Sequence, residues 1–225
     1  MVAIEAGHGG PSYPGTSSRD KDGNLWVEKD VVLDIAERLY KLLDADERYM
    51  PVMIRSGDTT LTAFDWANYR PSLIAEAQAR VDLANSVQAD VYLAIHLNGW
   101  YDSGYSGTET YYNPDRSFGY QSYGLAWYVQ DALVRKMQQA GYAVNDLGLR
   151  NDSDVGGDPN NQHSFALGTN ANFSPSLMPG VISESLFLTS AADLEFIRTK
   201  DGMDVLADAY KIALDSYFAW LVPPQ

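Results

Sequence analysis

Two histidines and two glutamates stand where they could form a catalytic metal site. His8, His96 and Glu184 each follow a run of apolar residues, as expected of polar side chains where buried strands end. Glu28 begins a segment with helical periodicity. The carboxyl ends of parallel strands meet at one edge of a sheet, so we expect these side chains to lie together. Two imidazoles and a carboxylate are a ligand set of catalytic zinc, and a further carboxylate can act as general base.

Each of these residues carries little weight alone. A single histidine near a strand end is most often a hydrogen-bonded structural residue. A glutamate at a helix start is favoured by the helix dipole without any catalytic role. The prediction of a site therefore depends on the joint placement of all of them.

Apolar runs and helical periodicities alternate along the chain. Strands are predicted from residue 2 and over residues 51–55, 90–96, 107–112, 142–149 and 180–184. Helices are predicted over residues 28–43, 65–87, 123–140, 191–199 and 203–221. This alternation predicts an α/β fold, a three-layer α/β/α sandwich whose mainly parallel sheet has helices on both faces. We expect residues 1–225 to form a single domain.

Two segments rich in Gly, Ser, Asn and Asp are predicted as loops. The first covers residues 11–24 and follows the opening strand. The second covers residues 151–176, and its length inside a compact domain is typical of a functional loop.

Composition narrows the classes of partner and of metal site. The chain has 30 acidic and 16 basic residues and a formal net charge of −14, which argues against a nucleic-acid partner. It has no cysteine, so any metal must be held by His, Glu or Asp. No apolar run approaches the length of a membrane span, so we expect no membrane-spanning helix, and no signal peptide is visible before the predicted first strand.

The motifs around these residues resemble those of a known family. They are Gly7-His8-Gly9-Gly10, Glu28-Lys29-Asp30, Ile95-His96-Leu97-Asn98, and Glu184 followed by Phe187-Leu188-Thr189-Ser190. In this order, and over nearly the whole chain, they resemble the zinc-dependent N-acetylmuramoyl-L-alanine amidases of the amidase-3 type.

The resemblance implies a fold, a reaction and a role for each residue. The fold is a twisted sheet of about six strands with helices on both faces. His8, Glu28 and His96 would bind one Zn²⁺ ion, and Glu184 would be the catalytic base. The substrate would be peptidoglycan, cut at the amide between N-acetylmuramic acid and L-alanine. The protein would be secreted, periplasmic or associated with the cell wall, and we expect a monomer.

Some positions depart from the family pattern or extend it. Glu5 stands where the family usually has Asp, and we expect it to orient His8. Asn98 is a candidate substrate contact or support for a ligand, and His163 is either a surface residue of the long loop or a substrate contact. Trp100 and Tyr101 are candidates for stacking against sugar rings.

Two alternatives stay open at this point. The first is a zinc peptidase or amidase that acts on another amide, because this ligand set is shared among metallohydrolases. The second is a degenerate module that binds cell wall without cutting it. The sequence does not distinguish a cell-separation autolysin from a spore-lytic enzyme or a phage lysin.

Overall fold

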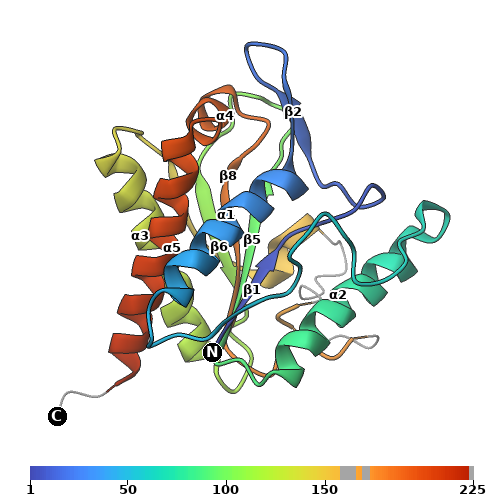
Figure 1. Ribbon diagram of the computed structural model, residues 1–225, viewed down its shortest axis with the longest axis vertical. Helices are drawn as coiled ribbons and strands as arrows, with labels where there is room; N and C mark the ends of the chain where they lie inside the picture. Colours follow the sequence, from blue (N-terminus) through green and yellow to red (C-terminus); the bar gives the residue numbers. More distant parts are fainter. Residues whose placement is uncertain (158–165, 169–172, 223–225) are drawn as a thin grey trace.

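The protein is built around one twisted sheet of six strands (Figure 1). The structure, a computed structural model, describes residues 1–157, 166–168 and 173–222. Across the sheet the strands are β4 (Pro51–Met53), β1 (Val2–Ala6), β5 (Val91–Asn98), β8 (Gly180–Phe187), β6 (Thr108–Tyr112) and β7 (Asp146–Asn151).

Most neighbouring strands run parallel. β4, β1, β5 and β8 form a parallel set, whereas β6 is antiparallel to β8 and parallel to β7. The reversal brings the start of β6 beside the carboxyl-terminal half of β8, where Glu109 pairs in register with Glu184. The predicted fold class, a mainly parallel α/β sandwich, is confirmed.

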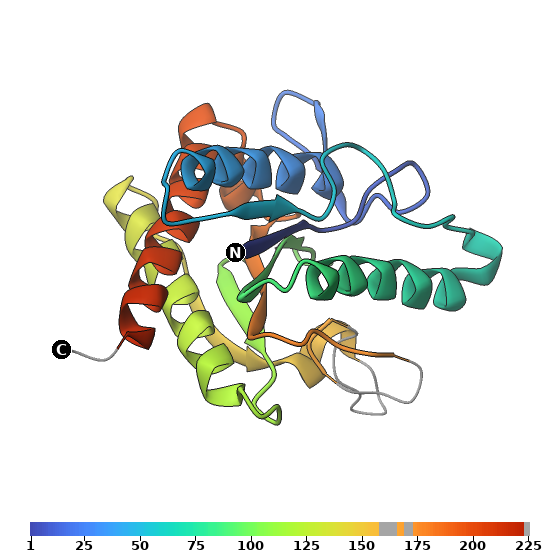
Figure 2. The ribbon, with the colours of Figure 1, turned by 60° about the horizontal axis from the view of Figure 1, so that its bottom comes forward.

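Helices cover both faces of the sheet (Figure 2). They are α1 (Glu28–Asp44), α2 (Tyr69–Ser86), α3 (Gly119–Gln139), α4 (Ala191–Ile197) and α5 (Lys200–Leu221), with short 3₁₀ turns η1 (Trp66–Asn68) and η2 (Asp152–Gly157). α1, α3 and α5 pack on one face in a large apolar cluster. α2 packs on the other face in a smaller cluster.

Side chains alternate between the two faces along each strand, and this decides where the polar residues point. Ala3, Ala94 and Ile182 belong to the cluster on the α2 face. Glu5, His96 and Glu184 each lie two residues further along the same strands. They therefore share the α2 face, near the carboxyl ends of three adjacent strands.

Two strands extend beyond the polar residues that were predicted to end them. β5 continues through Asn98 and β8 through Phe187, so His96 and Glu184 lie within strands. The prediction that they end their strands was wrong, because a half-polar segment can stay in the sheet when one face is less buried. His8 follows β1, as predicted.

The predicted loop at residues 11–24 contains a short strand. β2 (Ser17–Arg19) pairs antiparallel with β3 (Leu25–Val27), which leads directly into α1. The Asp20 carboxylate holds the turn, accepting hydrogen bonds from Asp22 N at 2.9 Å, Asn24 N at 2.9 Å and Trp26 Nε1 at 3.0 Å. Strands of three residues have too few apolar positions to be distinguished from a turn-rich loop.

The described parts of segment 151–176 are packed. After η2, Leu167, Phe173 and, just beyond the segment, Met178 are buried in the cluster on the α2 face. Within the described residues, no helix combines the length and the apolar character needed to cross a membrane.

Candidate active site

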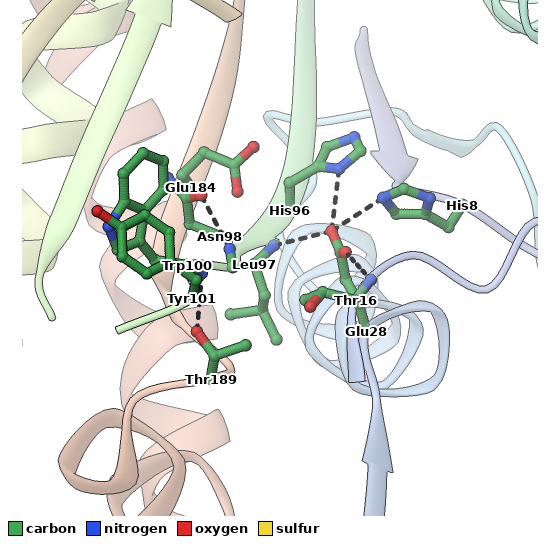
Figure 3. A pocket seen from close by; sticks show the side chains of 11 residues that line it. His8, Thr16, Glu28, His96, Leu97, Asn98, Trp100, Tyr101, Glu184 and Thr189 are labelled. Carbon is green, nitrogen blue, oxygen red and sulfur yellow. Dashed lines mark hydrogen bonds and ion pairs between the residues drawn. The ribbon is translucent and has the colours of Figure 1, made fainter. Parts of the chain in front are cut away.

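One pocket of about 360 Å³ opens at the carboxyl ends of the parallel strands, and the residues predicted to do chemistry line it (Figure 3). Its walls include His8, Glu28, His96 and Glu184 together. His8 comes from the turn after β1 and Glu28 from the first residue of α1. The structure thus brings together all four side chains.

Glu28 lies between the two histidines. Its Oε1 atom is 3.1 Å from His8 Nε2 and 3.1 Å from His96 Nδ1. His8, Glu28 and His96 each offer one ligand atom, and these three atoms lie within 4.8 Å of one another. Among the described residues, they form the one His/Cys/Asp/Glu group that could hold a metal ion. The backbone amide of Leu97 donates to Glu28 Oε1 at 3.1 Å and that of Thr16 donates to Glu28 Oε2 at 2.9 Å. These two hydrogen bonds fix the Glu28 carboxylate.

The backbone around the histidines is shaped for close approach. His8 has a φ of 60°, a conformation that costs free energy in a non-glycine residue and is often found at functional sites. A Cβ atom on Gly15 would lie 2.4 Å from Glu28 Oε2 and 2.7 Å from the His8 ring. Only glycine at that position allows the imidazole and the carboxylate to meet.

Two buried arginines fasten the strained turn. Arg80 on α2 donates to the carbonyl oxygens of Ala6 and His8. Arg55 donates to the carbonyl oxygens of Ala6 and Gly7 at 2.8 Å each. Charge-assisted hydrogen bonds of this kind are stronger than neutral ones, so they help to hold His8 in place.

Glu5 contacts a different histidine from the one predicted. Its Oε2 atom is 3.4 Å from His96 Nε2, and its Oε1 accepts a hydrogen bond from Arg80. Burial raises the pKa of Glu5, but Arg80 and His96 outweigh it and lower the pKa to about 2. Glu5 is therefore an ionised carboxylate behind His96. The prediction that it orients His8 was wrong, because the histidine that it contacts is His96. Strand alternation explains this, because Glu5 shares a sheet face with His96 of the neighbouring β5.

The charges of the site favour a cation. Burial lowers the pKa of His96, yet Glu28 and Glu5 oppose this and raise it well above its ordinary value. Burial raises the pKa of Glu28, but the two histidines outweigh it and hold the pKa far below its usual range. Positive charge among these groups is thus stabilised by two buried carboxylates.

Glu184 stands apart from the ion pairs. Its Oε2 atom is buried and has no hydrogen-bond partner. Burial raises its pKa to about 8, an effect that His96 opposes and that Glu28, Glu109 and Glu5 reinforce. A buried carboxyl group with a perturbed pKa in a pocket is a candidate catalytic acid or base.

Asn98 lines the pocket and is held by a residue that the sequence did not single out. Its Nδ2 donates to Glu109 Oε1 at 2.7 Å. Glu109 also accepts from Tyr111 OH at 2.8 Å and Arg150 Nε at 3.2 Å. The antiparallel direction of β6 places Glu109 beside Glu184, and no periodicity in the sequence reveals that direction.

Three further candidates from the sequence are Trp100, Tyr101 and His163. Trp100 and Tyr101 line the pocket on the same side as Glu184 (Figure 3). His163 lies outside the described residues.

The sequence matches the N-acetylmuramoyl-L-alanine amidase family over residues 2–216. The chain belongs to this amidase family. The predicted family membership is confirmed, and the protein is an enzyme of the amidase class.

Individual relatives agree with this membership. The amidase is 31% identical over 217 residues to the uncharacterised protein YqiI of Bacillus subtilis, covering 96% of this chain and 84% of that one. It is 30% identical over 207 residues to the N-acetylmuramoyl-L-alanine amidase LytC of the same organism, covering 91% of this chain and 34% of LytC. The solved N-acetylmuramoyl-L-alanine amidase of Clostridium difficile 630 is similar with a TM-score of 0.71 and 27% identity, covering 97% of this chain and 96% of that chain.

Proposed function

We propose that this amidase is zinc-dependent and hydrolyses the amide between N-acetylmuramic acid and L-alanine in peptidoglycan. In this proposal His8, Glu28 and His96 hold one zinc ion and Glu184 is the general base. The observation that carries it is the unpartnered, buried carboxylate of Glu184 in the same pocket as a compact His–Glu–His cluster.

The residues present fit a zinc ion. Imidazole nitrogens and a carboxylate oxygen are among the usual zinc ligands, and three protein ligands leave a position for water or substrate. His8 Nδ1 is buried with no hydrogen-bond partner, so the site has an imidazole nitrogen still to be satisfied. Glu5 behind His96 supplies the carboxylate support that metal-binding histidines usually have.

The chemistry divides between the ion and Glu184. Zinc would polarise the scissile carbonyl and lower the pKa of a water molecule. The Glu184 carboxylate would accept a proton from the attacking water and return it to the nitrogen of the leaving amine. A cation at the His–Glu–His cluster would lower the pKa of Glu184 from about 8 and so favour the ionised carboxylate that a general base needs.

The protein would act where its substrate is. Peptidoglycan lies outside the cytoplasmic membrane, so we expect the amidase to work in the periplasm or at the cell wall after secretion. We expect residues 1–225 to act as one catalytic domain and as a monomer.

Replacement of Glu184→Gln tests the proposed base. The variant keeps the shape of the side chain but cannot accept a proton, so release of stem peptides from purified peptidoglycan should fall by at least about a hundredfold. Zinc content measured by elemental analysis should stay at that of the wild type. Full activity in this variant would contradict the role of Glu184.

A further inference from the structure

Three exposed aromatic side chains form a platform at the rim of the pocket. They are Trp100, Tyr101 and Tyr105, which are 49%, 92% and 42% exposed. Trp100 and Tyr101 also line the pocket itself (Figure 3). Large apolar surface left in water beside a site commonly marks the place where a ligand binds.

The aromatic platform is held in place by contacts with Phe187 and Thr189. The ring centroids of Trp100 and Tyr101 are 4.9 Å apart, with an angle of 35° between the ring planes. The ring centroids of Trp100 and Tyr105 are 6.0 Å apart. Tyr105 packs edge-on against the buried ring of Phe187 at 5.0 Å. The backbone amide of Trp100 donates to Thr189 Oγ1 at 2.9 Å. These contacts tie the platform to the end of β8, so its faces are presented without a folding step on binding.

The charges around the platform select the class of ligand. The side chains that line the pocket include two glutamates and no lysine or arginine. The net charge of the chain is −14. A carboxylate-bearing stem peptide or an anionic lipid surface would meet no lysine or arginine among the side chains that line the pocket. An uncharged ring with a face of C–H bonds needs none, because those hydrogens meet the negative faces of the aromatic rings.

We propose that the aromatic platform binds sugar rings of the glycan strand next to the scissile amide. The proposal rests on the proposed function for its substrate, and it assigns the Trp100 side of the pocket to the sugar. In the bound substrate, the stem peptide would then extend from the scissile amide toward the opposite side of the pocket.

Glycan binding tests the platform without any hydrolysis. Glycan strands freed of stem peptides would be titrated into the zinc-loaded wild type and into Trp100→Ala by calorimetry. The dissociation constant should rise by about tenfold in the variant, the size of effect expected for loss of one aromatic stacking partner. Trp127→Ala is the matched control, because Trp127 is 46% exposed and lies on α3, outside the lining of the pocket. It should bind like the wild type.

Kinetics on substrates of graded length give a second readout. Substrates would carry the same stem peptide on one, two or four sugar rings. The ratio of KM between Trp100→Ala and wild type should widen as rings are added, and Trp100→Phe should restore most of the difference. Circular dichroism would verify that each variant is folded.

Three results would overturn the proposal. They are unchanged binding of stem-free glycan by Trp100→Ala, a KM ratio independent of glycan length, and weakened binding of a free stem peptide. The last would assign this wall to the peptide. A wild type that binds glycan through Trp100 but cuts no lactyl amide would contradict the proposed function and leave the platform standing, so the two failures are distinguishable.

Discussion

At the scale of single residues, Glu184 differs from the other buried glutamates of the site. Glu109 accepts hydrogen bonds from Asn98, Tyr111 and Arg150, and Glu5 is paired with Arg80. Glu184 has a buried oxygen with no partner. Leaving a buried acceptor unsatisfied costs free energy, and such a cost is usually kept where the group serves a reaction.

Glu5 should tune the affinity for zinc through His96. Replacement of Glu5→Gln removes the charge that lies 3.4 Å from His96 Nε2, and we expect zinc affinity to fall by about 10- to 100-fold. Competition with a chromophoric chelator measures this directly.

Glu76→Gln is the matched control for that experiment. Glu76 also pairs with Arg80, at 2.8 Å, but is not among the groups paired with either histidine. Both substitutions disturb the buried arginine and should lower the free energy of unfolding. Only Glu5→Gln should weaken zinc binding strongly, and equal zinc affinities in the two variants would exclude a role for Glu5 behind His96.

At the scale of elements, the approach of the turn at Gly15 to α1 sets the geometry of the site. Gly15→Ala would force a Cβ atom against Glu28 and His8, so we expect zinc affinity to fall by at least about tenfold. Gly23→Ala is the control, because Gly23 also has a positive φ, of 85°, but its Cβ would meet nothing within 4 Å.

The two glycine variants should therefore separate the effect of backbone strain at positive φ from the effect of displacing the Glu28 and His8 side chains. Gly23→Ala should be destabilised by about 1–2 kcal/mol in chemical denaturation because alanine is unfavourable at positive φ. Gly15→Ala should lose at least as much, because its Cβ also presses against Glu28 and His8. A Gly15→Ala protein that binds zinc as tightly as Gly23→Ala would show that the turn does not position the ligands.

The sequence predicted the elements with long apolar runs or clear helical periods and did less well where partners decide the structure. β1, β5, β8 and α1 carry their own patterns, so the positions of His8, Glu28, His96 and Glu184 could be found from the spacing of apolar residues. The hairpin of β2 and β3 depends on Asp20 and its hydrogen bonds rather than on a periodic pattern. The direction of β6 depends on pairing with β8, so Glu109 beside Glu184 was not predictable. The support of His96 by Glu5 depends on β1 and β5 being neighbours in the sheet, and no pattern within one strand gives the order of strands.

At the scale of the whole molecule, the net charge of −14 affects how the protein meets a negatively charged wall. Screening weakens the repulsion between like charges, and the Debye length falls from about 30 Å at 0.01 M salt to about 8 Å at 0.15 M. Binding to purified peptidoglycan that carries free stem-peptide carboxylates should therefore strengthen over this range. Sedimentation of bound protein measures it, with peptidoglycan amidated at its carboxylates as control. Binding that weakens with salt would contradict this expectation.

The most direct test of the proposed reaction is mass analysis of the products from purified peptidoglycan. A zinc amidase with this site should release intact stem peptides that begin with L-alanine and leave glycan strands bearing free lactyl groups. Release should stop on treatment with a chelator and return when zinc is added. Cleavage within the stem peptide, or unchanged release by metal-free protein, would contradict a zinc-dependent N-acetylmuramoyl-L-alanine amidase.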